Sequence, residues 1–170
     1  AGERVFGSVG EGYWEDVGTL SAYVRAHKDI LDGRVVVSIP GFELADGVYV
    51  GEGAEINPGA HLTGPCVIGD NCFVDAGVRL GEYVVLGTGV RMRRDGELER
   101  TVVHDNAYIG ESVKMRGAVV GRASDLRRGV RCEEGVVLGD EVFVGENAVL
   151  SSDVKVYPFK TVEAGAVVNT

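Results

Sequence analysis

The chain has 170 residues, a length typical of one domain, or of one domain with part of another. Its 26 glycines are about twice the usual share of ~7%, and its many valines favour strands over helices, which excludes a helical bundle. The net charge of −9 disfavours nucleic acids and anionic membranes as partners of the whole chain, because both are polyanions. No apolar stretch approaches the ~18 residues of a membrane-spanning helix and no leader sequence is visible, so we expect a cytoplasmic protein.

Residues 1–43 predict one helix and little other regular structure. Apolar side chains recur with helical spacing from Leu20 to Leu31, Thr19 is placed to cap the amino end, and Gly33 is placed to end the helix. An extended, glycine-rich segment precedes this helix, and a short connector follows it. Because such a region has no core of its own, we interpret it as the closing edge of an α/β domain whose beginning lies upstream.

A repeat of six residues runs through the rest of the chain. Every sixth residue is apolar from Leu44 onward, and the register slips by one residue twice, after Leu98 and after Met115. The expected inward-facing positions are Leu44, Val50, Ile56, Leu62, Ile68, Val74, Leu80, Leu86, Met92, Leu98, Val103, Ile109, Met115, Val120, Leu126, Cys132, Leu138, Val144, Leu150, Val156, Val162 and Val168. Repetition at a fixed period indicates a solenoid, in which each repeat packs on its neighbours.

Three residues after most inward positions stands Gly, Asn or Asp, the residues that best accept a left-handed backbone conformation. These turn positions are Gly47, Gly53, Gly59, Asn71, Gly77, Gly89, Asp95, Asn106, Gly129, Gly135, Asn147, Asp153 and Gly165. Each hexad therefore predicts a short strand and a tight turn, and three hexads close one triangular coil. The pattern resembles the hexapeptide-repeat family. This resemblance implies a mainly β fold, a left-handed parallel β-helix of about seven coils over residues 44–170, preceded by a short α/β remnant with one helix.

A second resemblance lies ahead of the predicted helix. The segment from Gly12 to Leu20, with the sequence GYWEDVGTL, resembles the WxDxGT motif that closes the catalytic domain of sugar-phosphate nucleotidyltransferases. In that family a hexapeptide β-helix commonly follows, as the repeat does here. The tail from Glu133 to Asn169 is most similar to bacterial mannose-1-phosphate guanylyltransferases, particularly those that continue into a phosphomannomutase domain.

This resemblance implies a reaction in which mannose 1-phosphate attacks the α-phosphorus of GTP, forming GDP-mannose and releasing pyrophosphate. It implies a Mg²⁺ cofactor, held by substrate phosphates and one or two carboxylates, and it gives Asp16 the role of a Mg²⁺ ligand in the complete enzyme. The family's glycine-rich nucleotide-binding loop, second metal-binding aspartate and sugar-phosphate-binding lysine have no counterpart in this sequence. We therefore predict no catalytic residue in this chain and no activity without an upstream catalytic domain.

Two other functions stay open. Some hexapeptide proteins are acyltransferases in which a histidine acts as general base toward an acyl-CoA thioester, and His104 is the candidate on an internal coil, although its position also suits an exposed turn residue. Alternatively, the prism is an oligomerisation module without a ligand. Both ends of a β-helix expose unpaired strand edges, which the upstream domain, another subunit or a downstream domain could cover. We expect a homo-oligomer. Cys66, Cys72 and Cys132 fall at inward positions, so they are expected to be core residues rather than disulfide or metal sites.

Basic residues gather in the middle of the repeat. Residues 79–131 hold 11 Lys and Arg against 7 Asp and Glu, whereas the segments on either side are acidic. The register places four arginines at one corner, two coils apart: Arg93, Arg94, Arg127 and Arg128. It places Lys114 and Arg131 one coil apart on a neighbouring corner. Guanidinium groups arranged in this way suit a phosphate or a carboxylate-rich surface, so the arginine corner is a candidate anion site.

Overall fold

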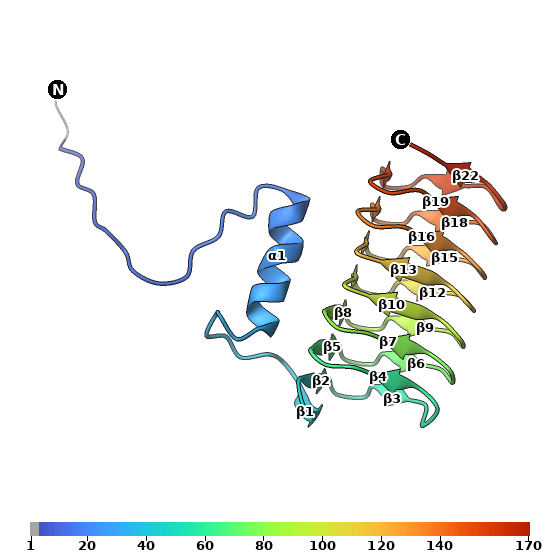
Figure 1. Ribbon diagram of the computed structural model, residues 1–170, viewed down its shortest axis with the longest axis horizontal. Coiled ribbons are helices and arrows are strands. Elements are labelled where there is room, and N and C mark those ends of the chain that lie inside the picture. The colour runs from blue at the N-terminus through green and yellow to red at the C-terminus, as the bar shows by residue number, and fades with distance from the viewer. Residues whose placement is uncertain (1–3) are drawn as a thin grey trace. The chain divides into compact units, whose positions relative to one another are not determined.

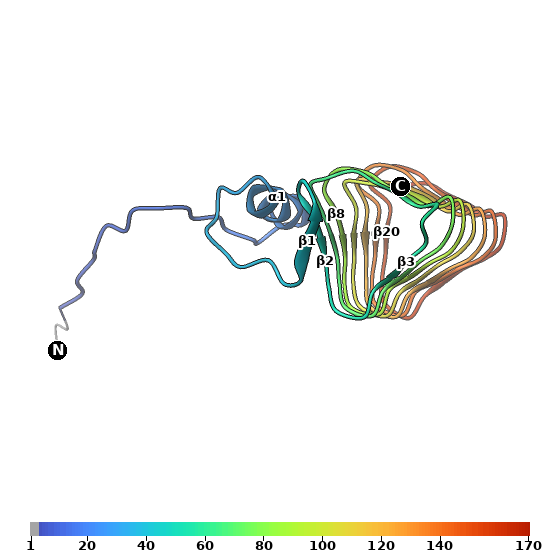
Figure 2. The same cartoon turned by 90° about the horizontal axis from the view of Figure 1, so that it is seen from below.

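The structure is a computed structural model that describes residues 4–170. The chain forms two compact units, one ending at Val37 and the other running from Ser38 to Thr170. The second unit is a stack of short strands wound into coils (Figure 1). Viewed along the stack, the coils superpose into one three-sided outline (Figure 2). The predicted fold, a mainly β chain with about seven turns of parallel β-helix and a single helix, is confirmed.

The first unit is organised around helix α1, Leu20–Leu31. The Thr19 side chain accepts a hydrogen bond from the backbone N–H of Ala22 at 3.2 Å, and Gly33 follows the helix with a φ of +72°, so both predicted helix ends are confirmed. The apolar stripe of the helix is only partly buried. The buried helix residues are instead Ala22 and Asp29.

In the second unit the strands form three sheets, one for each side of the coil. Sheet A contains β1 (Phe42–Ala45), β2 (Val48–Val50), β5 (Cys66–Ile68), β8 (Val84–Leu86), β11 (Val102–Val103), β14 (Val119–Val120), β17 (Val137–Leu138) and β20 (Lys155–Val156). Sheet B contains β3 (Glu55–Ile56), β6 (Phe73–Val74), β9 (Arg91–Met92), β12 (Tyr108–Ile109), β15 (Asp125–Leu126), β18 (Phe143–Val144) and β21 (Thr161–Val162). Sheet C contains β4 (His61–Leu62), β7 (Arg79–Leu80), β10 (Glu97–Glu99), β13 (Lys114–Arg116), β16 (Arg131–Cys132), β19 (Val149–Leu150) and β22 (Val167–Val168).

The inward side chains form one continuous core along the axis of the β-helix. From β2 onward each strand pairs in parallel with the equivalent strand of the next coil, so equivalent positions stack directly, as in the series Met92, Ile109 and Leu126. These three side chains are fully buried. The stacking of apolar side chains at equivalent positions removes apolar surface from water in every coil. This burial stabilises a chain whose strands are only two to four residues long.

The two register slips lie on the same connection of the coil. The passages from β10 to β11 and from β13 to β14 both lead from sheet C to sheet A, and each is one residue shorter than its counterparts. The neighbouring coils nevertheless stay in register, with Val102 paired to Val119 and to Val85. The predicted placement of both deletions on one face is therefore correct.

Left-handed backbone conformations occur at the predicted turn positions with one exception. All thirteen have a positive φ except Gly59, whose N–H donates a hydrogen bond to the Asn57 side chain in a local turn. The sequence pattern missed left-handed residues with ordinary side chains: Tyr83, Arg100, Ser112, Ala123, Glu141 and Phe159. At these positions the surrounding coil imposes the conformation against the residue's own preference.

The first predicted inward position, Leu44, is not part of the core. It lies in β1, which runs antiparallel to β2 along the edge of sheet A, and 57% of its surface is exposed. The regular coil therefore begins at β2 rather than at Leu44. This hairpin pairs the free edge of β2, which would otherwise present unpaired backbone groups to solvent.

Two further expectations concern the whole chain. No helix within residues 4–170 is long and apolar enough to cross a membrane. The cysteines are free and buried, as expected of core residues. Burial raises the pKa of the Cys66 thiol to about 11 and that of Cys132 to about 12, so both stay protonated at neutral pH.

Candidate functional site

The segment that carries Asp16 is held against helix α1 by polar contacts. The Tyr13 hydroxyl donates a hydrogen bond to Oδ2 of buried Asp29 at 2.9 Å, and Nη1 of Arg34 binds the other oxygen of that carboxylate at 3.0 Å. Glu15 forms an ion pair with Arg25. Desolvation and the hydrogen bond to Asp29 raise the pKa of Tyr13. Sequence reasoning missed this network, because Asp29 lies within the helix, 16 residues from Tyr13.

The Asp16 carboxylate itself is exposed to solvent, two residues ahead of Gly18. A Cβ at Gly18 would lie 3.3 Å from Oδ1 of Asp16, so the glycine leaves space for this carboxylate. Mg²⁺ commonly takes one or two protein carboxylates and completes its shell with substrate phosphates and water. Asp16 fits that role as a single ligand. Among residues 4–170, no group of three or more His, Cys, Asp or Glu side chains could hold a metal ion without such help.

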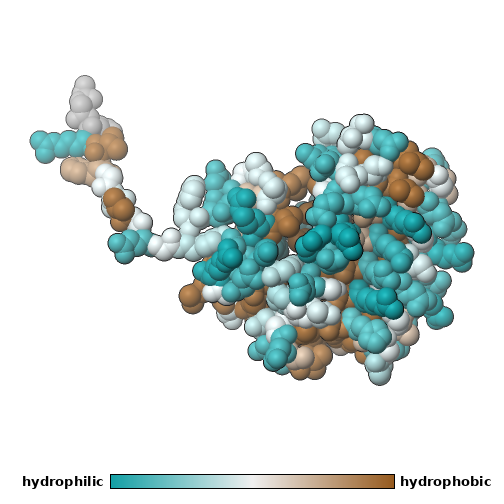
Figure 3. Space-filling view, viewed as in Figure 1, coloured by the Kyte–Doolittle hydropathy of each residue, from teal (hydrophilic) through white to brown (hydrophobic). Residues whose placement is uncertain are grey.

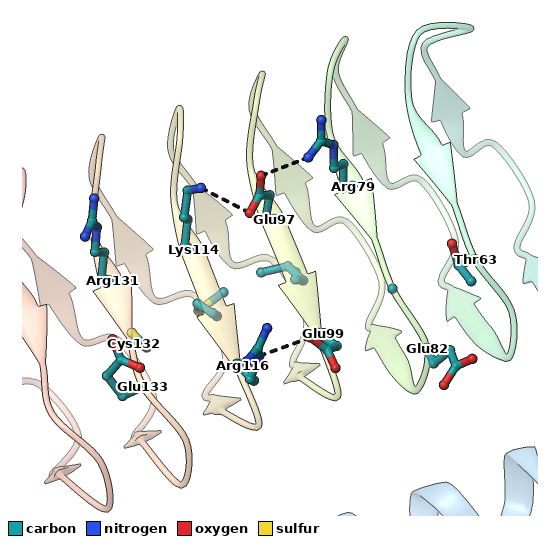
Figure 4. A pocket seen from close by; sticks show the side chains of 13 residues that line it. Thr63, Arg79, Glu82, Glu97, Glu99, Lys114, Arg116, Arg131, Cys132 and Glu133 are labelled. Carbon is teal, nitrogen blue, oxygen red and sulfur yellow. Dashed lines mark hydrogen bonds and ion pairs between the residues drawn. The ribbon is translucent and has the colours of Figure 1, made fainter.

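In the second unit, a shallow hollow lies on the outer face of sheet C (Figure 4). A first row of charges crosses neighbouring strands there: Arg79, Glu97, Lys114 and Arg131. Glu97 is bridged on both sides, by Nη1 of Arg79 at 3.4 Å and by Nζ of Lys114 at 3.1 Å. Arg131 stacks beside Lys114, and within the described residues no ion pair to it is found. Lys114 and Arg131 therefore lie on paired strands, not on a corner as predicted.

A second row of charges lies at and just beyond the carboxyl ends of β10, β13 and β16, and Glu99 and Arg116 of this row line the hollow. Nε of Arg116 lies 3.0 Å from Oε2 of Glu99, and Nη2 of Arg100 lies 2.8 Å from Oε2 of Glu134, two coils away. The second contact passes over Gly117, where a Cβ would collide with the Glu134 carboxylate. These pairs could have been found from the sequence, because a spacing of 17 or 18 residues brings side chains into register on adjacent coils.

The hollow is a mixed-charge surface. Its described lining contains four cations and four carboxylates, Arg79, Lys114, Arg116, Arg131, Glu82, Glu97, Glu99 and Glu133, and no histidine. The one lining thiol, Cys132, stays protonated because its pKa is raised to about 12. Hydrophilic side chains cover much of the β-helix surface turned toward the viewer in Figure 3.

The four residues of the arginine corner lie just after strands β9 and β15 of sheet B. Acidic side chains pair with three of them. Nε of Arg93 lies 3.7 Å from Asp75, and Nε of Arg94 lies 3.7 Å from Glu111. Arg127 binds Oδ2 of Asp125 at 2.9 Å. For Arg128 no ion pair is found among the described residues. The four arginines thus gather as predicted, but three of them already have a carboxylate partner.

His104 lies just after β11, at a position where the coils on either side have Gly87 and Gly121. It is half-buried, and its backbone N–H donates a hydrogen bond to the carbonyl oxygen of Val120. His61 lies on a different sheet, in β4. Within the second unit, residues 38–170, the structure therefore brings no other histidine to His104.

The chain is similar to sugar-phosphate nucleotidyltransferases over most of its length. The glucose-1-phosphate adenylyltransferase of Desulfitobacterium hafniense is 29% identical over 162 residues, which is 88% of this chain and 40% of that protein. The bifunctional protein GlmU of Listeria monocytogenes is 28% identical over 71% of this chain and 35% of its own length. The chain therefore spans less than half the length of these relatives.

Among solved structures, a hexapeptide transferase family protein from Anaplasma phagocytophilum matches with a TM-score of 0.65. The match has 18% sequence identity and covers 67% of this chain and 72% of that one, so it shows the left-handed β-helical fold and no function. A family model described as the GMPPB C-terminal domain matches residues 62–170, well over half of the chain. On this match, the chain belongs to the GMPPB C-terminal domain family.

Proposed function

We propose that this chain is the carboxyl-terminal part of a sugar-1-phosphate nucleotidyltransferase, and that the complete enzyme joins GTP and mannose 1-phosphate to form GDP-mannose and pyrophosphate. One observation carries the proposal. Similarity to a glucose-1-phosphate adenylyltransferase extends over 88% of the chain, more than residues 44–170 alone could supply, so it includes part of the segment before the β-helix. The WxDxGT-like segment supports the nucleotidyltransferase reaction, and the choice of guanine and mannose rests on the resemblance of the tail from Glu133 to Asn169 to mannose-1-phosphate guanylyltransferases.

Within that enzyme Asp16 would hold Mg²⁺ together with the phosphates of the substrates. The bound ion would neutralise the crowded phosphate oxygens of the nucleotide. The residues of this chain position the carboxylate: Thr19 fixes the start of α1, and Gly18 leaves space beside Asp16. The Tyr13–Asp29 hydrogen bond ties the preceding segment to the helix.

The β-helix would serve assembly, domain packing or regulation rather than the chemical step. Ion pairs engage Glu97 and Glu99 in the hollow on sheet C, and its described lining has no histidine, which supports a structural role for this surface. The partners we propose are the enzyme's own catalytic domain, a second copy of the chain and, in a fused protein, a phosphomannomutase domain. We place the protein in the cytoplasm, where nucleotide sugars would be formed.

The test uses the full polypeptide that contains this chain, with pyrophosphate release as the readout. Asp16→Asn should lower kcat by about 100-fold, the order seen when one group that stabilises developing charge is removed, and should raise the Mg²⁺ concentration needed for half-maximal rate. Asp46→Asn, a matched exposed acid in the turn after β1, should leave both unchanged. Full activity in Asp16→Asn would contradict the ligand role. Acetyl-CoA binding that is lost in His104→Ala, without pyrophosphate release by the wild type, would instead favour an acyltransferase.

A further inference from the structure

Two side chains of the segment ahead of helix α1 contact one face of that helix. The Tyr13 hydroxyl binds Asp29, and Glu15 forms an ion pair with Arg25. Arg25 and Asp29 are four residues apart in α1, so they are neighbours on the helix surface. Two residues of extended chain span about 6.6 Å and four residues of helix about 6.0 Å, so both contacts can form in register. The order of the partners shows that the segment runs antiparallel to α1.

The alternate residues of the same segment lie on its other side. Trp14 is 80% exposed and Asp16 is also exposed, whereas Glu15 between them is partly buried. Successive side chains of an extended chain point in opposite directions, which accounts for this alternation. The contacts of Tyr13 and Glu15 with the helix therefore set the direction in which Asp16 presents its carboxylate.

Asp29 is a buried carboxylate within α1, and its two oxygens bind two different parts of the chain. Its side chain is only 8% exposed. Oδ2 accepts the hydrogen bond from Tyr13 at 2.9 Å, and Oδ1 is bound by Nη1 of Arg34 at 3.0 Å. A buried carboxylate is stable only when it is paired, so loss of either donor leaves an oxygen of Asp29 without its partner. The two contacts therefore depend on each other.

Arg34 belongs to the connector between α1 and β1, residues 32–41. Besides its guanidinium contact, its backbone N–H donates a hydrogen bond to the carbonyl oxygen of Asp29 at 2.9 Å. The connector is thus held at this residue through both its side chain and its backbone. One acidic residue joins the segment that carries Asp16 to the connector that leads into the β-helix.

We propose that Asp29 is a positioning residue, through which the connector at Arg34 controls the place of the Asp16 carboxylate. The inference rests on the proposed function in one respect, the role of Asp16 as a Mg²⁺ ligand. While Arg34 binds Oδ1, the Asp29 side chain is fixed and offers Oδ2 to Tyr13. When Arg34 moves away, the carboxylate loses a donor and can rotate, so the Asp16 segment is held less firmly. Displacement of the connector therefore weakens Mg²⁺ binding, and it acts through Asp29 rather than by direct contact.

Trp14 is the only tryptophan of the 170-residue chain, so its fluorescence reports the order of this segment without substrate or metal. Time-resolved anisotropy measures the amplitude of its nanosecond motion. Tyr13→Phe, Asp29→Asn and Arg34→Ala should each raise this amplitude by about twofold, because each removes a hydrogen bond of the buried carboxylate. Arg34→Lys keeps a charged donor and should restore most of the wild-type value.

Two controls match these variants in the second unit. Tyr157→Phe removes the hydroxyl of an exposed tyrosine, and Arg122→Ala breaks an exposed ion pair with Asp140. Both should leave the Trp14 anisotropy unchanged. An unchanged anisotropy in Tyr13→Phe would overturn the anchoring role of Asp29. A rise in Tyr13→Phe without a rise in Arg34→Ala would overturn the coupling to the connector.

The full polypeptide tests the consequence for the metal. The Mg²⁺ concentration for half-maximal pyrophosphate release should rise about five- to tenfold in Tyr13→Phe and in Arg34→Ala, with a smaller change in kcat. The double variant should exceed the larger single effect by no more than about twofold, since both donors act through one carboxylate. Multiplying effects would overturn the shared route through Asp29. If the wild type releases no pyrophosphate, the proposed function fails, and the anisotropy of the 170-residue chain decides the coupling by itself.

Discussion

Sheets A and C share one backbone repeat but present opposite outer faces. The outward positions of sheet A are apolar over six coils: Tyr49, Val67, Val85, Val102, Val119 and Val137. The equivalent positions on sheet C alternate in charge through Arg79, Glu97 and Lys114. The inward side chains of the two sheets are indistinguishable in kind, and nearly all are buried. The inward positions therefore determine the fold, while the outward positions are free to differ and can carry function.

The largest loss of stability should come from substitution of an inward-facing residue. Leu126→Ala removes a fully buried side chain from the middle of the stack, and the neighbouring coils can close the cavity only in part. We expect the free energy of unfolding to fall by about 3 kcal/mol. Urea denaturation followed by circular dichroism measures this loss. A change below about 0.5 kcal/mol would show that the coils repack freely, contrary to a core-determined fold.

Substitutions at the turn positions should cause the next largest loss of stability. Gly129 has a φ of +73°, and a Cβ there would also collide with the Asn147 side chain, so Gly129→Ala should cost about 1–2 kcal/mol. Gly59 is the matched control, because it lacks the left-handed conformation although it occupies an equivalent turn. Its replacement by alanine should change the unfolding free energy by less than about 0.5 kcal/mol. Equal costs at the two glycines would contradict the conformational explanation.

The two outer faces can be compared directly. Val119→Ala on sheet A shortens a buried side chain and should cost about 1 kcal/mol, whereas Glu97→Ala on sheet C breaks two exposed ion pairs and should cost less than about 0.5 kcal/mol. Thermal unfolding at low and high salt provides the measurement, since only the Glu97 variant should alter the salt dependence. A larger loss of stability in Glu97→Ala than in Val119→Ala would contradict the view that sheet A, and not sheet C, has a stabilising outer face.

The smallest effect concerns the buried thiols. The pKa of Cys132 is raised to about 12 by burial, so the folded chain keeps a proton that the unfolded chain loses near pH 9. Stability should therefore fall as the pH rises above about 9, and the fall should be shallower in Cys132→Ala. Unfolding free energies at neutral and alkaline pH test the slope. Identical slopes in the two proteins would show that the thiol is not buried in solution.

The sequence predicted most of the β-helix because its inward positions are set by one local rule, apolar side chains at a period of six residues. The rule failed at Leu44 and Gly59, where a hairpin and a local turn replace the regular coil. At the candidate sites it located the arginine corner but not its carboxylate partners. Those contacts depend on side-chain directions, as where Arg127 lies across two rings, and a spacing pattern does not determine such directions.

Pyrophosphate release tests most directly the proposal that this chain is part of an enzyme that forms a nucleotide sugar. Pyrophosphate release by the full polypeptide should be measured with GTP and ATP, each combined with mannose 1-phosphate and with glucose 1-phosphate. The account predicts Mg²⁺-dependent release that is fastest with GTP and mannose 1-phosphate. Faster release with ATP and glucose 1-phosphate would keep the reaction but overturn the proposed substrates. No release from any pair would contradict that proposal.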